Sequence, residues 1–127
     1  MEAKGIQVTD ENFDESGPGI RVGLSLKGGT PSDLGKASWF VDPSVRLSDV
    51  LDVKFAQSPF YKQDVAGRDL HLQLPGAPVP AHFEPTSPGT VRATLPYAVP
   101  TWPGVRAAVI DLNGKPLRVA GGGTCTF

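Results

Sequence analysis

Residues 69–84 read DLHLQLPGAPVPAHFE, and this stretch decides the fold that the sequence predicts. Apolar and polar residues alternate on both sides of the Pro-Gly-Ala-Pro segment at 75–78, which is the pattern of two strands joined by a tight turn. Folding the stretch about residues 75–78 gathers every apolar side chain on one face, as burial requires. The resulting pairs are Leu74 with Val79, Leu72 with Ala81, and Leu70 with Phe83.

Proline and glycine also punctuate the rest of the chain, with 13 Pro and 15 Gly among 127 residues. Proline fixes φ and lacks a backbone donor, and glycine supplies turn conformations, so no long helix fits between them. The strand that contains Pro80 is expected at a sheet edge or with Pro80 pointing outward. Shorter alternating stretches predict further strands. These stretches are 20–26, 37–41 with Trp39 as a core residue, 90–95, 105–112 and 115–120.

The dipeptide Asn113-Gly114 is the strongest short hairpin signal in the chain, because a type I′ turn needs positive φ at both central positions. Apolar stretches flank it on both sides, so the sequence predicts a two-residue turn here. The pairs expected from that turn are Ile110 with Leu117 and Ala108 with Val119.

About seven or eight short strands between turns indicate an all-β fold, and we expect an antiparallel β-sandwich, of which the immunoglobulin-like arrangement is one form. Three parts are expected: an acidic N-terminal arm over 1–19, the β-sandwich domain over 20–120, and a glycine-joined tail over 121–127. Residues 45–56 fit either a strand or a helix face. A strand over 51–56 with one helical turn before it is favoured.

The charge of the chain is nearly balanced, with 12 Lys and Arg against 13 Asp and Glu for a net charge of −1. No overall basic field attracts nucleic acid and no basic amphipathic run suits a membrane surface, so neither partner is expected. The first residues contain no apolar h-region, so no signal peptide is expected. No phosphate loop and no Gly-x-Ser-x-Gly elbow is present, so we expect no cofactor and no enzyme activity.

The polar face of the 69–84 hairpin holds the residues that a metal site would need. In the register above, His71 lies opposite His82 and Asp69 opposite Glu84, with Cβ atoms about 4.5–5.5 Å apart. Two imidazoles and a carboxylate can bind a divalent transition metal. No third histidine is available, and a solvated face accounts for the same residues. We therefore favour no metal, and keep these residues as the ones that would form such a site.

Two other features are candidates for binding. Tyr97 and Trp102 lie in the proline-rich segment 96–104, where stiffened rings either stack on a sugar or cover one end of the sandwich. Cys125 follows three glycines, and a thiol on a flexible arm suggests a carrier that bears its substrate on a C-terminal cysteine. The alternative for Cys125 is a reduced cysteine in a terminal strand.

The two termini are expected to work between subunits. The acidic arm is too polar to bury against its own domain, yet it carries Ile6, Val8 and Phe13. Phe127 ends the tail beyond a glycine joint. Docking of these side chains on neighbouring copies would stabilise an assembly through apolar burial.

These observations favour a non-enzymatic structural subunit of a large assembly, namely a bacteriophage virion protein that decorates the capsid or forms part of the tail. Its expected partners are copies of itself or other subunits, and its expected location is the virion. The alternative is a secreted or periplasmic β-sandwich module that binds a glycan or a metal. A thiol carrier that uses Cys125 is the third hypothesis.

Overall fold

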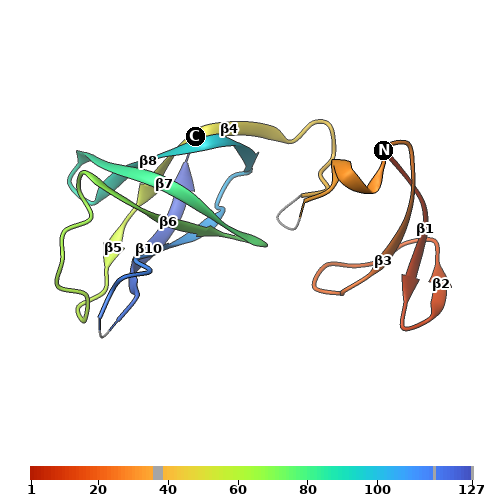
Figure 1. Cartoon of the computed structure of the whole chain (residues 1–127), viewed down its shortest axis with the longest axis horizontal. Coiled ribbons are helices and arrows are strands. Elements are labelled where there is room, and N and C mark those ends of the chain that lie inside the picture. The colour runs from red at the N-terminus through yellow and green to blue at the C-terminus, as the bar shows by residue number, and fades with distance from the viewer. Residues whose placement is uncertain (36–38, 116, 127) are drawn as a thin grey trace. The chain divides into compact units, whose positions relative to one another are not determined.

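The computed structural model describes residues 1–35, 39–115 and 117–126. The chain divides into two compact units, Met1–Ser38 and Trp39–Phe127 (Figure 1). Each unit has its own sheet, and every strand pair is antiparallel, so the predicted all-β antiparallel class is confirmed. Within the described ranges, no helix is long and apolar enough to cross a membrane.

The N-terminal unit is a small three-stranded sheet. Strands β1 (Glu2–Val8), β2 (Glu11–Phe13) and β3 (Gly23–Lys27) pair in the order β2-β1-β3, and a short 3₁₀ helix, η1 (Pro31–Asp33), follows. The free arm expected over 1–19 therefore contains two strands that pair within the chain. Its signal was missed because the β1–β2 turn is Thr9-Asp10, with φ of 49° and 63°, rather than the Asn-Gly that such turns favour.

The second unit, called the barrel unit below, contains the remaining strands. They are β4 (Arg46–Lys54), β5 (Ala56–Gln57), β6 (Arg68–Leu74), β7 (Ala77–Ser87), β8 (Thr90–Thr101), β9 (Arg106–Ile110) and β10 (Val119–Thr126).

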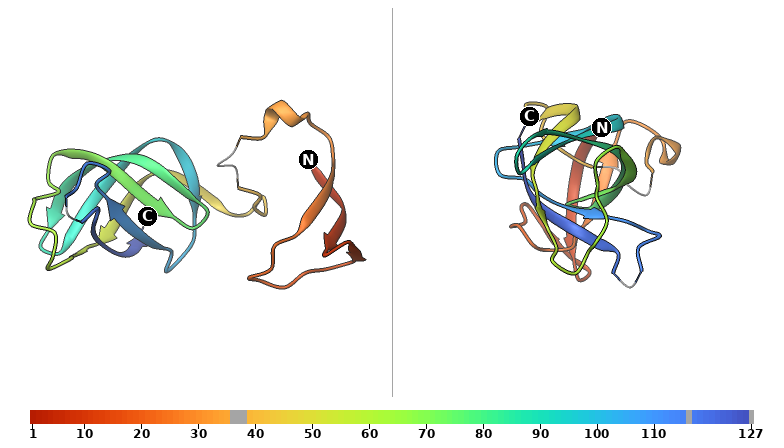
Figure 2. Two further views of the ribbon diagram at one scale, coloured as in Figure 1. Left: turned by 60° about the horizontal axis from the view of Figure 1, so that its bottom comes forward. Right: turned by 90° about the vertical axis from the view of Figure 1, so that its left-hand side faces the viewer.

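Strand β10 closes the sheet of this unit into a barrel. It pairs with β9, and its last residues pair with β4, Cys125 with Val53 and Thr126 with Asp52. The order β4-β8-β7-β6-β9-β10 thus returns to β4, with β5 paired to β10 beside this ring. In Figures 1 and 2 these strands curve round a common interior. The predicted β-sandwich, immunoglobulin-like or not, is wrong, because a sandwich keeps two sheets and here one sheet closes on itself.

Close backbone contacts explain the glycine run of β10. A Cβ at Gly122 would lie 2.7 Å from the carbonyl oxygen of Ala107, and a Cβ at Gly123 would overlap the carbonyl oxygen of Lys54. No larger residue fits where β10 passes between its neighbours. The segment 121–127, expected as a glycine-joined tail, is in its described part a strand of the barrel.

The barrel encloses one apolar core. Phe83, Leu51 and Leu72 are its largest fully buried side chains. Trp39 packs against this core and donates its Nε1–H to the carbonyl of Pro75 at 2.9 Å. The strand expected over 37–41 is absent at 39–41, and residues 37 and 38 lie outside the described ranges.

The hairpin at 69–84 forms with the predicted inward face but a different register. Leu72 pairs with Val79 instead of Ala81, and Leu70 pairs with Ala81 instead of Phe83. The turn contains only Pro75 and Gly76, whose φ of +89° fits the glycine position of a type II turn. A shift of two residues preserves the alternation of faces, so the same side chains remain buried.

The second predicted hairpin register is also wrong. Val119 pairs with Ile110 rather than with Ala108, and the connection runs over residues 111–118. The side chain of Asp111 turns into the barrel, and its Oδ1 accepts a hydrogen bond from the Asn113 backbone N–H at 3.0 Å. This local bond replaces the two-residue turn that Asn-Gly favours elsewhere. Residues 46–54 form a strand, as favoured for part of this region, and no helical turn precedes it.

Gly123→Ala is expected to lower the free energy of unfolding of the barrel unit by about 1–3 kcal/mol or more, because the new methyl group overlaps the backbone of Lys54. Urea denaturation measures the change. Gly17→Ala is the matched control, since a Cβ there meets nothing within 4 Å. Equal stability of the two variants would contradict the proposed packing of β10.

Candidate functional site

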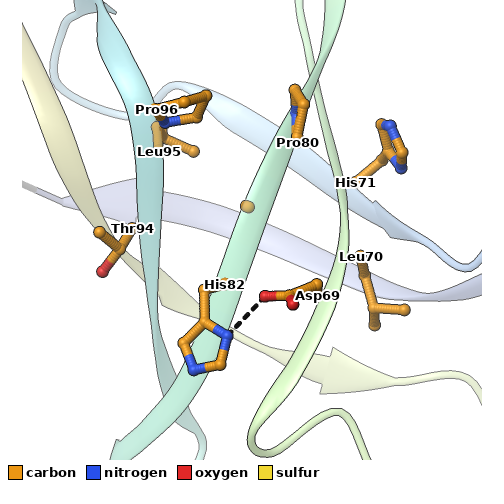
Figure 3. Close-up of a pocket in the computed structure, with 9 residues that line it drawn as sticks. Asp69, Leu70, His71, Pro80, His82, Thr94, Leu95 and Pro96 are labelled. Carbon is orange, nitrogen blue, oxygen red and sulfur yellow. Dashed lines mark hydrogen bonds and ion pairs between the residues drawn. The ribbon is translucent and has the colours of Figure 1, made fainter.

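The outer faces of β6, β7 and β8 form a shallow, open depression of about 390 Å³ (Figure 3). It lies on the polar side of the 69–84 hairpin, where the sequence predicted its candidate metal ligands. The lining residues are Asp69, Leu70, His71, Pro80, Ala81, His82, Thr94, Leu95 and Pro96.

A histidine held between two carboxylates is the main polar feature of this depression. His82 on β7 lies opposite Asp69 on β6, and its Nδ1 is 2.6 Å from Asp69 Oδ1. Its Nε2 is 2.9 Å from Glu84 Oε1. A neutral imidazole has one N–H donor, so only the imidazolium can donate to both carboxylates. The hydrogen bonds that His82 donates to Asp69 and, to a smaller extent, to Glu84 raise the pKa of His82, against a smaller effect of desolvation.

The structure separates the two histidines that the sequence placed together. His71 pairs with Pro80, not with His82, because the hairpin register differs by two residues. The 2.6 Å between His82 Nδ1 and Asp69 Oδ1 is a hydrogen-bond distance, whereas two ligands of a tetrahedral metal site would lie about 3.3–3.6 Å apart. In the part of the chain that the structure describes, no group of three or more His, Cys, Asp or Glu side chains is placed to hold a metal ion.

The same contacts limit what His82 can do chemically. Thr94 is its cross-strand neighbour on β8 and carries the hydroxyl of this depression. Both ring nitrogens of His82 are already bonded to carboxylates. The histidine therefore has no free nitrogen with which to accept a proton from that hydroxyl.

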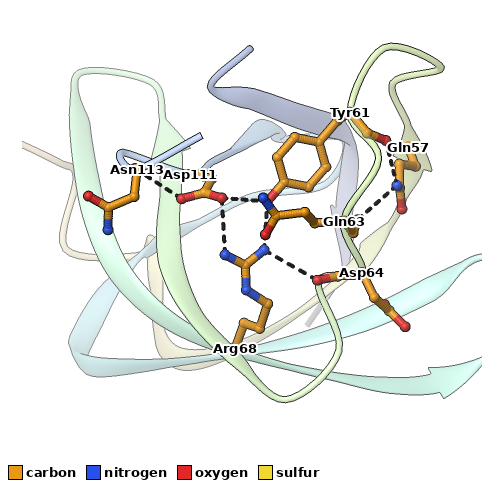
Figure 4. A network of polar contacts seen from close by, with 7 residues as sticks. All are labelled: Gln57, Tyr61, Gln63, Asp64, Arg68, Asp111 and Asn113. Atoms are coloured by element: carbon orange, nitrogen blue, oxygen red, sulfur yellow. Dashed lines mark hydrogen bonds and ion pairs between the residues drawn. The ribbon is translucent and has the colours of Figure 1, made fainter. Parts of the chain in front are cut away.

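A second polar cluster, which the sequence interpretation missed, lies at one end of the barrel (Figure 4). The Tyr61 hydroxyl donates to Asp111 Oδ2 at 2.6 Å. Arg68 Nη1 donates to the Tyr61 oxygen at 2.6 Å, and Arg68 Nη2 donates to Asp111 Oδ2 at 3.0 Å. The Asp111 side chain is only 3% exposed and that of Arg68 is 32% exposed. A nearly buried carboxylate is thus paired and fully hydrogen-bonded.

The titration of this cluster follows from its contacts. The Tyr61 hydroxyl, Arg68 and the Asn113 N–H together hold the pKa of Asp111 below its ordinary value, although burial opposes them. Burial and the bond to Asp111 raise the pKa of Tyr61. The cluster is therefore stable as a carboxylate, a guanidinium and a neutral phenol at neutral pH.

A signal for this cluster was present in the sequence. Asp111 continues the inward alternation of Val105, Ala107 and Val109, so period two places a carboxylate on the buried face. On β6 the same alternation places Arg68 two residues before the inward-facing Leu70. Two opposite charges at inward positions near strand ends need each other as partners.

The remaining candidate residues do not converge on one site. Tyr97 on β8 and Trp102 just after it are 46% and 40% exposed, and a stacking role for them stays a prediction. Cys125 is 1% exposed within β10, and burial raises its pKa to about 11. A buried, protonated thiol cannot serve as a swinging carrier, so that expectation is wrong.

The residues expected at subunit interfaces lie mostly in the N-terminal sheet. Ile6 pairs with Phe13 and with Leu24, and Val8 pairs with Glu11. Phe13 remains 45% exposed. Phe127 lies outside the described residues. Nothing in the described ranges supports association between copies of the chain.

Comparisons with known proteins show which fold this chain shares. No family model matches the chain. The uncharacterized protein MJ0325 of Methanocaldococcus jannaschii is 24% identical over 121 residues, which are 94% of this chain and 39% of that protein. The apo crystal structure of translation elongation factor SelB from Methanococcus maripaludis aligns with 98% of this chain, at a TM-score of 0.74 and 22% identity. The chain spans only 33% of that structure.

These findings overturn the virion assignment. The shared fold is a barrel found in a translation factor, and neither comparison involves a virion, a capsid decoration or a sandwich module. The physical reason for the error is the closure by β10, which converts a set of short strands compatible with a sandwich into a barrel. The expected virion location rested on that assignment alone.

The hydrogen bonds of His82 to Asp69 and Glu84 predict a pH-dependent contribution to the free energy of unfolding. Because the folded-state pKa of His82 is raised above 6.5, this contribution is present below about pH 6.5 and is lost as the pH rises through the raised value. An NMR titration of the His82 ring checks the direction. Asp69→Asn should bring the pKa of His82 back toward 6.5, whereas His71→Gln should leave it unchanged. A pKa of His82 at or below 6.5 in the wild-type protein would contradict the proposed hydrogen bonds to Asp69 and Glu84.

Tyr61→Phe is expected to lower the free energy of unfolding by roughly 1.5–3 kcal/mol, because it removes a hydrogen bond to a charged and nearly buried carboxylate. Tyr97→Phe is the matched control, since the Tyr97 side chain is exposed. Chemical denaturation of both variants measures the difference. A Tyr61→Phe variant as stable as the control would show that the cluster does not hold the fold.

Proposed function

We propose that this chain provides a partner-binding barrel for a translation-related protein, and that its partner is RNA or a component associated with the ribosome. The observation that supports this is the match of 98% of the chain to elongation factor SelB at a TM-score of 0.74. This proposal replaces the expectation of no nucleic-acid partner, which rested on the net charge of the whole chain. Local charge decides binding more directly than net charge does.

The proposed role is binding and not catalysis. Both nitrogens of His82 are bonded to carboxylates, and Asp111 is paired with Arg68 and accepts a hydrogen bond from the Tyr61 hydroxyl. The thiol of Cys125 is buried and has a pKa of about 11. A catalytic site would use groups of these kinds, but here each of them is either bonded to other side chains or buried.

RNA binding by the chain is expected to be detectable and to weaken with salt, because phosphate contacts release counterions. Fluorescence anisotropy with a labelled, folded RNA measures it as salt rises from about 50 to 200 mM, alongside co-sedimentation with ribosomes. An equally long DNA duplex is the control for nonspecific attraction to a polyanion. If neither RNA nor ribosomes bind above that control, the proposed function is wrong.

A further inference from the structure

Two loops lie side by side at one end of the barrel. The loop over 58–67 joins β5 to β6, and the described residues 111–115 and 117–118 lie between β9 and β10; together these two segments are called the loop pair. The Ser58 N–H donates to the Ala120 carbonyl at 2.8 Å, so the first loop begins where the second ends. Tyr61 and Asp111, one from each loop, bond at 2.6 Å (Figure 4).

The first loop is held in one conformation. Gln57 Nε2 donates to the carbonyls of Tyr61 and Gln63 at 2.9 and 3.0 Å, and the Gly67 N–H donates to the Phe83 carbonyl at 2.7 Å. The side chains of Tyr61 and Val65 are buried in the core. A loop fixed at this many points presents its other side chains at little additional entropic cost.

Phe60 is the side chain that this fixed loop presents. It is 75% exposed, more than any other large apolar side chain in the described ranges, although its neighbour Tyr61 is buried. A fixed, solvent-exposed aromatic ring is the kind of group on which an unpaired base stacks.

Cationic side chains lie on the same two loops as this ring. Lys62, Lys115 and Arg118 are exposed, and the Lys62 ammonium donates a hydrogen bond to the Pro59 carbonyl at 2.6 Å. Arg68 and Asp111 form an ion pair with each other. Segments 58–68 and 111–118 carry four cations and two carboxylates, a net charge of +2, whereas the whole chain carries −1 and its remainder therefore −3. The two loop segments are thus positively charged, whereas the rest of the chain is negatively charged.

We propose that the loop pair binds unpaired nucleotides of RNA. Phe60 stacks on a base, and Lys62, Lys115 and Arg118 contact the phosphates on either side. The combination favours RNA over an acidic peptide, because a carboxylate-rich peptide uses the charges but gains nothing from an exposed ring. It favours unpaired over duplex RNA, because bases in a duplex are already stacked. This inference rests on the proposed function and names the surface and the form of its partner.

The test uses the full chain and a labelled oligouridylate of about 12 nucleotides, in the range of single-strand site sizes. Phe60→Ala should weaken binding roughly tenfold or more, since stacking contributes strongly to each base contact. Lys115→Gln with Arg118→Gln should reduce the slope of log K against log salt by about 0.7 for each lost phosphate contact. Thermal melts should match wild type, because all three side chains are exposed.

Matched controls lie elsewhere on the barrel unit. Phe40→Ala removes an aromatic ring that is 54% exposed, and Lys54→Gln with Arg106→Gln removes two exposed cations from β4 and β9. Neither control should change the affinity by more than about twofold at moderate salt, where distant charges are screened.

The outcomes separate this inference from the proposed function. If the wild-type chain binds RNA but the loop-pair variants bind as well as the controls, the loop pair is not the site and the proposed function stands. If polyglutamate competes as well as unlabelled oligouridylate, the surface recognises anions in general and the assignment to RNA is wrong. If neither RNA nor ribosomes bind the wild-type chain, both the proposed function and the proposed loop-pair site are wrong.

Discussion

The rest of the structure depends on the passage of β10 between β9 on one side and β5 and β4 on the other. Backbone approaches at Gly122 and Gly123 are too close for any side chain, and they bring Cys125 against Val53 to close the ring. Closure leaves the six-stranded barrel without a free edge strand, so its core is enclosed. Side chains that could bind a partner therefore lie on the outer faces of the strands and in the loops. Phe60 and the exposed cations of the loop pair lie in such loops.

The side of the sheet on which each residue lies could be predicted from the sequence, whereas the register could not. Burial decides which alternate residues of a strand face inward. The core residues predicted in this way include Leu70, Leu72, Val79 and Phe83, and all four face the core. Register depends on how many residues the turn uses, and Pro75-Gly76 turns the chain with two where four were expected. Pro80 lies outside the stretch of β7 that pairs with β8 and is exposed, which agrees with the expectation of an edge-like or outward position.

Closure and the polar cluster escaped prediction for a different reason. A run of glycines is typical both of a flexible joint and of a strand squeezed between two others, and only the partners of that strand distinguish them. Arg68 and Asp111 were visible as charges at inward positions, but their pairing joins residues far apart in the sequence. Phe60 gave no signal at all, because its exposure follows from the anchoring of Tyr61 and Gln57 around it.

Because Cys125 is buried, its reaction rate with a thiol reagent can report how often the barrel opens. The thiolate is the reactive form of cysteine, and burial of the Cys125 side chain in the apolar core raises the pKa of this thiol to about 11. Alkylating reagents can therefore reach it only while the barrel opens and exposes this part of the core. The rate at which Cys125 is labelled under native conditions would report the frequency of that opening, and RNA bound to the loop at the start of β10 would slow it if binding and closure are coupled.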